Sequence, residues 1–124
     1  HDLFPPGTAE LQPKDFAQLD IITALCKIYP QPINVEAHTD NQPIRTTQFP
    51  SNWELSAHRA AAVARYLVLA GKIDPKRLKS SGYAQYRPVG PNETEAQRRE
   101  NRRVDVILAR EADVPVTVNE SQAW

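Results

Sequence analysis

The sequence predicts a two-layer α/β (α+β) sandwich in which helices pack on one face of a small mixed β-sheet. Two patterns favour this class: helical and strand-like segments alternate along the chain, and 124 residues suffice for one such core. Hydrophobic residues make up 40% and charged residues 24% of the chain, which is typical of a folded protein rather than a disordered one. We divide the chain into one domain over residues 1–110 and a C-terminal tail over residues 111–124.

The first third of the chain predicts a short strand, a helix and a second strand. Residues 3–4 are apolar and could form an edge strand. Residues 14–28 place apolar side chains at helical spacing, and Pro30 ends that segment. In residues 33–38 every second side chain is apolar, which predicts a strand with one buried face.

A long helix is predicted to begin at Ser51. Ser51 and Glu54 fit a capping box, in which the hydroxyl accepts from the amide of Glu54 and the carboxylate reaches back. The helix should end at Gly71 as a left-handed cap. We interpret Trp53 as a packing anchor rather than a stacking platform, because its neighbours are core-like. The predicted buried stripe consists of small and aliphatic side chains: Ser56, Ala60, Val63, Ala64 and Leu67.

The rest of the chain predicts two more strands and a short helix. Residues 78–84 are expected to form a strand that Gly82 interrupts, and residues 104–108 the last clear strand. Asn92 or Thr94 is expected to cap a short helix between them. The tail from residue 111 is either an edge strand or a frayed end.

Composition excludes several function classes. Lys and Arg (15) balance Asp and Glu (15), so no net field draws the domain to nucleic acid, and we expect no nucleic-acid partner. The single cysteine, Cys26, excludes an internal disulfide and a cysteine-based zinc site. No apolar segment approaches the 18 residues of a membrane span. Because the chain begins with His1 rather than Met, we expect it to be a piece of a longer protein.

Asp40 and Arg59 are the leading candidates for ligand binding. Asp40 follows the strand at residues 33–38, and ligands of open α/β sheets bind beyond strand ends. Arg59 lies two turns into the long helix at the margin of its apolar stripe, so its head can emerge near Asp40. A carboxylate that binds an ammonium, beside a guanidinium that binds a carboxylate, would form a receptor for a zwitterion. Residue types alone leave open a merely structural ion pair between the two.

Catalytic and metal sites have weaker support. His38 and His58 have no recognised metal spacing, and no nucleophile motif is present, so we expect no metal, no cofactor and no catalytic residue. We interpret His38 as a solvated or hydrogen-bonded imidazole. The cluster Arg98, Arg99, Arg102 and Arg103 is interpreted as a solvated face with internal salt bridges.

Three strings, taken together and in order, resemble the OmpA-like peptidoglycan-binding domain over about residues 3–108. They are Ile33-Asn34-Val35-Glu36-Ala37-His38-Thr39-Asp40, Leu55-Ser56-Ala57-His58-Arg59-Ala60 and Asn101-Arg102-Arg103-Val104. Within that family, the loop Asn41-Gln42-Pro43-Ile44 and the segment from Phe49 to Ser56 are similar to the flagellar stator branch, the MotB-type proteins. One departure is Ala37, where the family commonly has Gly.

The resemblance implies non-catalytic binding of the diaminopimelate in a cell-wall stem peptide. It implies that Asp40 holds the ammonium and Arg59 the carboxylate of that residue. Thr39, Asn52, Leu55 and Arg102 are expected to line the same site, with Arg98 nearby.

The resemblance also implies a role and a location. The domain would anchor a flagellar motor stator to peptidoglycan. It would be a periplasmic domain, anchored to the inner membrane through a missing N-terminal region that also meets an ion-channel stator partner subunit. A homodimer is expected.

Two alternatives remain open. The first is a wall-tethering domain of an outer-membrane porin or lipoprotein. The second is an enzyme acting on the wall peptide, with His38 and Asp40 as acid and base.

Overall fold

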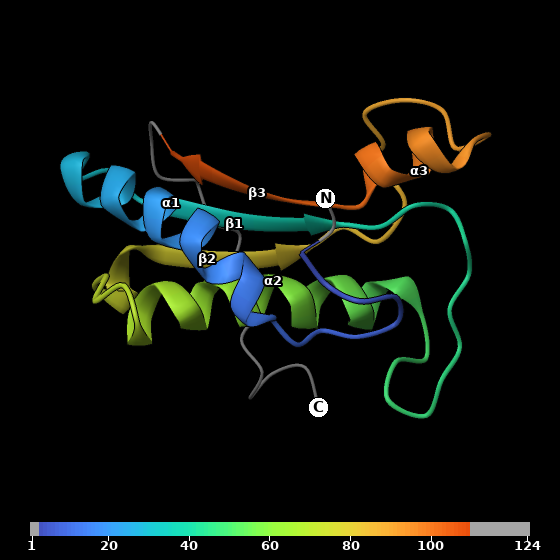
Figure 1. Cartoon of the computed structure of the whole chain (residues 1–124), viewed down its shortest axis with the longest axis horizontal. Coiled ribbons are helices and arrows are strands. Elements are labelled where there is room, and N and C mark those ends of the chain that lie inside the picture. Colours follow the sequence, from blue (N-terminus) through green and yellow to red (C-terminus); the bar gives the residue numbers. More distant parts are fainter. Residues whose placement is uncertain (1–2, 110–124) are drawn as a thin grey trace, which may run out of the picture.

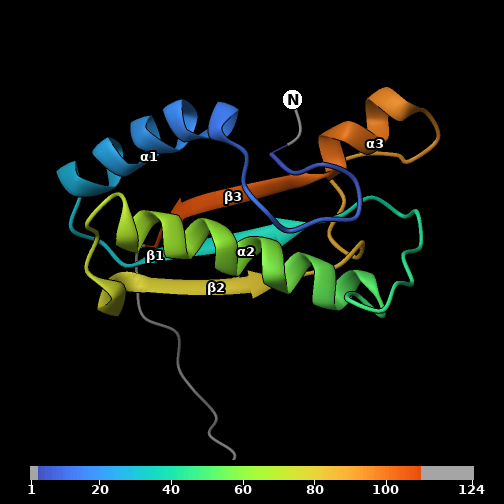
Figure 2. The same ribbon diagram turned by 60° about the horizontal axis from the view of Figure 1, so that its bottom comes forward.

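The structure, a computed structural model, describes residues 3–109, in which one layer of helices packs against one sheet. Figure 1 and Figure 2 show that helices α1 and α2 cover the same face of a three-stranded sheet, while α3 stands at one end of it. The elements are η1 (Pro13–Asp15), α1 (Phe16–Ile28), β1 (Ile33–His38), α2 (Asn52–Leu69), η2 (Pro75–Arg77), β2 (Leu78–Gly82), α3 (Glu95–Asn101) and β3 (Arg103–Leu108). The predicted two-layer class is confirmed. The predicted tail, residues 111–124, lies outside the described residues.

The sheet is mixed, as predicted, with β1 in its centre. Its order is β2-β1-β3; β2 runs parallel to β1, with Ile33 opposite Leu78, and β3 runs antiparallel, with Ile33 opposite Leu108. Ile33, Val35 and Ala37 are fully buried against the helices, so the two-residue alternation identified the core face. Because β1 and β2 are parallel, their carboxyl ends meet at one end of the molecule, beside α3 and the loop that leads to α2 (Figure 1).

Ser51 caps α2, as predicted, but with a different amide. Its hydroxyl accepts a hydrogen bond from the amide of Trp53 (3.2 Å) rather than from that of Glu54, and it donates to the Glu54 carboxylate. This hydroxyl bond lowers the pKa of Glu54. The small-residue stripe is confirmed in its main members: Ser56, Ala60, Val63 and Leu67 are fully buried.

The end of α2 differs from the prediction. Lys72, with φ 59°, adopts the left-handed conformation that we expected at Gly71. Gly71 is needed for space instead, because a Cβ there would lie 2.6 Å from the Leu67 carbonyl oxygen and 2.6 Å from a methyl of Thr23 on α1. The glycine therefore permits close contact between the two helices.

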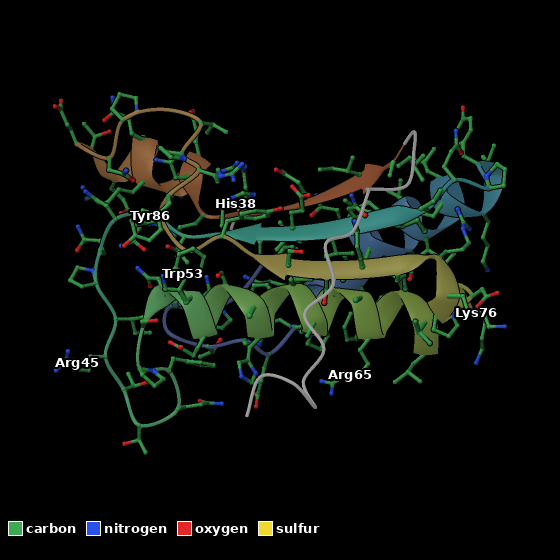
Figure 3. All side chains as sticks on the ribbon, turned by 180° about the vertical axis from the view of Figure 1, so that it is seen from behind. His38, Arg45, Trp53, Arg65, Lys76 and Tyr86 are labelled. Carbon is green, nitrogen blue, oxygen red and sulfur yellow. The ribbon has the colours of Figure 1, made fainter. Side chains whose placement is uncertain are left out.

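Three local predictions are wrong. Residues 3–4 form no strand; Phe4 instead buries its side chain in the core. Strand β2 ends at Gly82, before the predicted limit, because Ala84 turns the chain with φ 54°. Trp53 does not anchor the core: the residue is 50% exposed and its ring stacks on that of Tyr86. The two residues lie near each other in the view from behind (Figure 3).

Gly82→Ala is expected to destabilise the fold. A methyl there would collide with the backbone nitrogen of Ala57 and lie 2.5 Å from the Ser56 hydroxyl, both on α2. We expect the free energy of unfolding in urea to fall by about 1–3 kcal/mol. Gly90→Ala is the matched control, because nothing lies within 4 Å of its added methyl. Equal stability of the two variants would contradict the close approach of α2 to β2.

Candidate ligand-binding site

A pocket of about 750 Å³ lies at the carboxyl end of β1. The N-terminal segment, the loop after β1, the first turns of α2 and the α3–β3 junction supply its walls. Its volume falls within the range of small-molecule sites. Six predicted site residues line it: Thr39, Asp40, Asn52, Leu55, Arg59 and Arg102.

Arg98 is the predicted residue that the structure does not bring to the pocket wall. Its guanidinium donates to the carbonyls of Asn92 and Glu93 and contacts the Glu95 carboxylate at 3.4 Å. These contacts hold the loop before α3. Arg98 therefore does not line the pocket, but it contacts Glu95, which does.

Asp40 is buried at the base of the pocket. One carboxylate oxygen accepts from the amide of Gln42 (2.9 Å), and the other pairs with the Arg102 guanidinium (2.7 Å). Only 6% of the residue is exposed. Each carboxylate oxygen has two acceptor positions. Asp40 can therefore accept a further hydrogen bond from a donor on a ligand.

Arg59 is held in the pocket wall by the N-terminal segment. Its Nε donates to the carbonyl of Thr8 (2.7 Å) and one terminal nitrogen donates to that of Pro5 (3.2 Å). The ring of Phe4 lies under the guanidinium, 5.0 Å from its carbon. These contacts orient the buried guanidinium at the wall of the pocket.

The structure brings Asp40 and Arg59 to one pocket without joining them. Within residues 3–109, the ion pairs at this site link Arg102 to Asp40 (2.7 Å) and to Glu95 (2.6 Å), and none links Asp40 to Arg59. The alternative of a structural Asp40–Arg59 pair is therefore wrong. Arg102 also lowers the pKa of Glu95 by hydrogen bonding.

Sequence reasoning missed Asn101, which fixes the position of Arg102. Asn101 is fully buried; its side-chain oxygen accepts from the amide of Val89 (2.8 Å). Its side-chain nitrogen donates to the carbonyl of Gly90 (3.1 Å) and to the side chain of Asn92 (2.8 Å). In a polar run of sequence an asparagine gives no signal of such burial, because its partners come from a loop about ten residues away.

His38 does not match its interpretation as a solvated or hydrogen-bonded imidazole. It is 5% exposed, neither ring nitrogen has a hydrogen-bond partner among residues 3–109, and the ring stacks on Tyr83 at 5.1 Å. Burial, and secondarily the charge of Arg103, lowers its pKa. The nearest carboxylate, that of Asp105, is 3.7 Å from Nε2.

Neither a metal cluster nor a membrane helix is found in the described part of the chain. Across residues 3–109, no three His, Cys, Asp or Glu side chains gather closely enough to hold a metal ion. No helix in that range combines the length and apolar character needed to cross a bilayer.

Comparison with known proteins defines the class. Residues 3–102 match the OmpA family, and the chain belongs to that family. Its relatives place it in the MotB-type branch, as the sequence motifs predict. Domains of this kind are non-catalytic, so the alternative of a wall-peptide enzyme is rejected.

Three relatives illustrate the similarity. Motility protein B of Bacillus subtilis is 38% identical over 106 residues, which cover 85% of this chain but 41% of that protein. A MotB-like protein from Desulfovibrio vulgaris has a solved structure with a TM-score of 0.80 and 35% identity, covering 88% of this chain and 70% of the other. The cell wall anchor of the T6SS from Pseudomonas aeruginosa gives a TM-score of 0.78 and 33% identity, covering 84% and 72%. The chain thus spans less than half the length of its Bacillus relatives.

The burial of His38 predicts a pH dependence of stability. Because its pKa in the folded state is lowered from the ordinary value of 6.5, the unfolded chain takes up a proton first as the pH falls. The free energy of unfolding should therefore decrease below about pH 6.5 and be unaffected by this group above it. Urea unfolding at pH 7.5 and pH 5.0 measures the difference.

His38→Phe keeps the stacked ring and removes the titration, so this variant should lose less stability on acidification than the wild type. His58→Gln, at an exposed position, is the control for histidine content. If the His38→Phe variant loses as much stability as the wild type, the buried imidazole is not the group responsible.

Proposed function

We propose that this domain binds cell-wall peptidoglycan through the diaminopimelate of a stem peptide and thereby anchors a flagellar motor stator. The observation that carries the proposal is the pocket in which a buried carboxylate and a buried guanidinium have separate partners. A ligand can therefore approach both groups. The side-chain end of diaminopimelate carries an ammonium and a carboxylate on one carbon, which is the complementary arrangement.

The local charges favour this orientation of the ligand. Asp40, Glu95, Arg98 and Arg102 form one ion-pair network, and the unfilled acceptor positions of the Asp40 carboxylate give an ammonium a negatively charged partner. Arg59 is 7% exposed and lines the pocket, so a carboxylate there would accept charge-assisted hydrogen bonds in a desolvated setting. Leu55 supplies an apolar wall for the methylene groups between the two ends of the ligand.

The remaining proposed ligand residues have supporting roles. Thr39 is fixed by the bond from its amide to the carbonyl of Ala84 (2.9 Å), and Asn52 donates to the carbonyl of Gln42 (3.1 Å). Both contacts shape the rim around Asp40. Arg98 would act through Glu95 rather than on the ligand.

The role as a stator anchor is supported by the MotB-type relatives. A stator that pushes on a rotor needs a fixed attachment, and binding to cross-linked wall polymer would provide the reaction force. We propose accordingly a periplasmic domain of a homodimeric protein anchored in the inner membrane, with an ion-channel partner subunit. The solved relatives from Helicobacter pylori are described as periplasmic domains of MotB.

A second role uses the same pocket chemistry. A peptidoglycan-associated lipoprotein of Pseudomonas aeruginosa is 34% identical over 103 residues, so a wall tether on an outer-membrane lipoprotein or porin is the alternative. Fractionation of the full-length protein between inner and outer membranes distinguishes the two roles.

Asp40→Ala and Arg59→Ala should each abolish co-sedimentation with purified diaminopimelate-type peptidoglycan, with affinity reduced at least about tenfold. Arg59→Lys should also bind poorly, because it keeps the charge but loses the planar pair of donors. Since Arg59 holds the N-terminal segment, urea unfolding must show that each variant remains folded. Arg65→Ala, an exposed arginine on the same helix, is the control.

The ligand itself provides a second control. Peptidoglycan with lysine in place of diaminopimelate has the ammonium but lacks the adjacent carboxylate, so the wild-type domain should bind it much more weakly. Equal sedimentation with the two walls, or unchanged sedimentation of a folded Asp40→Ala variant, would refute the assigned site.

A further inference from the structure

A pair of exposed, stacked aromatic rings lies outside the pocket but at the same end of the molecule. Trp53 in the first turn of α2 is 50% exposed, and Tyr86 in the loop after β2 is 61% exposed. Their ring centroids are 5.3 Å apart and their planes are inclined by 29°. Figure 3 shows Trp53 at the start of α2 and Tyr86 nearby, at the end of the molecule where β1 reaches His38.

The loop that carries Tyr86 is held rigidly in an unfavourable backbone conformation. Ala84 has a φ of 54°, a left-handed conformation that residues with a Cβ rarely adopt. Two hydrogen bonds fix it: its amide donates to the Ser56 hydroxyl (3.0 Å), and its carbonyl accepts from the amide of Thr39 (2.9 Å). Strain that the surrounding structure enforces is a feature of functional positions. Here it presents an aromatic ring to solvent.

A series of contacts connects these rings to the pocket. The Asp40 carboxylate accepts from the amide of Gln42, whose carbonyl accepts from the side chain of Asn52. Asn52 also reaches the side-chain oxygen of Gln85 at 3.5 Å. Trp53 follows Asn52 in the chain and Tyr86 follows Gln85. The aromatic pair is therefore adjacent to the rim of the pocket.

We infer that Trp53 and Tyr86 form a subsite for a sugar ring of the wall glycan, an inference that rests on the proposed binding of the stem peptide. A β-linked amino sugar has an apolar face of C–H groups, which packs on the electron-rich face of an aromatic ring. The polar side chain of Gln85 lies next to this surface and can meet the hydroxyl groups at the edge of the sugar.

The length of the ligand agrees with this placement. Diaminopimelate is the third residue of the stem peptide, so two residues separate it from the sugar that carries the peptide. A sugar that carries a peptide bound at Asp40 can therefore reach the surface beyond the rim of the pocket. Asp40, Gln42, Asn52 and Gln85 contact one another in succession between the pocket and the aromatic pair.

Calorimetric titration with two matched probes tests the subsite. The first probe is the free tripeptide L-Ala–γ-D-Glu–meso-diaminopimelate, and the second is the same tripeptide attached to the GlcNAc–MurNAc disaccharide. The wild-type domain should bind the second probe about tenfold more tightly, which corresponds to the burial of one sugar face. Trp53→Ala and Tyr86→Ala should each remove most of this difference and leave the affinity for the free tripeptide within about twofold.

Two variants serve as controls. Leu69→Ala removes an exposed apolar side chain at the other end of the same helix and should retain the full difference. Tyr86→Phe keeps the ring and should also retain it.

Each other outcome overturns the inference in a recognisable way. Equal binding of both probes by the wild type removes the subsite but leaves the peptide pocket intact. A Trp53→Ala variant that weakens both probes equally assigns Trp53 to the pocket or to the fold, and one that keeps the tenfold preference places the sugar elsewhere. If neither probe binds the wild type, the proposed function fails together with the subsite.

Discussion

The close approach of α2 to the parallel β1–β2 pair is the constraint on which the rest of the structure depends. Gly82 on β2 faces Ser56 and Ala57 of the helix with no room for a methyl group, and Ala60 continues the same small-residue stripe. Interhelical contact at Gly71 fixes α2 against α1 in the same way. A helix held this tightly has little freedom to slide or rotate, because side chains in a packed core interlock. Its first three turns therefore carry the pocket residues in fixed positions relative to the end of β1.

The opposite charges of Asp40 and Arg59 lie in one pocket and have different partners. Arg102 binds Asp40 from the α3–β3 junction, and backbone carbonyls of the N-terminal segment bind Arg59. A direct ion pair between Asp40 and Arg59 would neutralise both groups and leave little to attract a zwitterion. Separate partners instead offset part of the cost of burying each charge while preserving the field between them. The N-terminal segment is thus part of the site and not merely a lead into the fold.

The end of the sheet that carries the pocket also carries its least regular backbone. Ala84 adopts a left-handed conformation, and Asn101 uses its whole side chain to hold the loop before α3. Both depend on buried hydrogen bonds, which are costly to break in a desolvated setting. The same end of the molecule carries the guanidinium of Arg102 in the pocket wall and the stacked rings of Trp53 and Tyr86 outside it. Pocket and aromatic surface therefore share one supporting structure.

Local physics made much of the fold predictable from the sequence. The alternation in Ile33, Val35 and Ala37, the cap at Ser51 and the small-residue stripe of α2 each depend on neighbours a few positions away. These patterns identified the helices, the strands and the mixed sheet. Motifs taken in order identified the OmpA family and nominated Asp40 and Arg59 as candidates for one site, and the structure places both in one pocket.

Partners distant in the chain were decided only by the tertiary structure. Arg59 bonds with Thr8, 51 positions away, and Arg102 with Asp40, 62 positions away, and nothing local to either residue indicates such pairing. The exposure of Trp53 and the burial of His38 were likewise decided by the tertiary structure. Each depends on where the loop around Tyr83 and Tyr86 packs, and that position is set by the completed core. Sequence periodicity tells which face of an element is buried, whereas the identity of a contact requires the elements to be assembled.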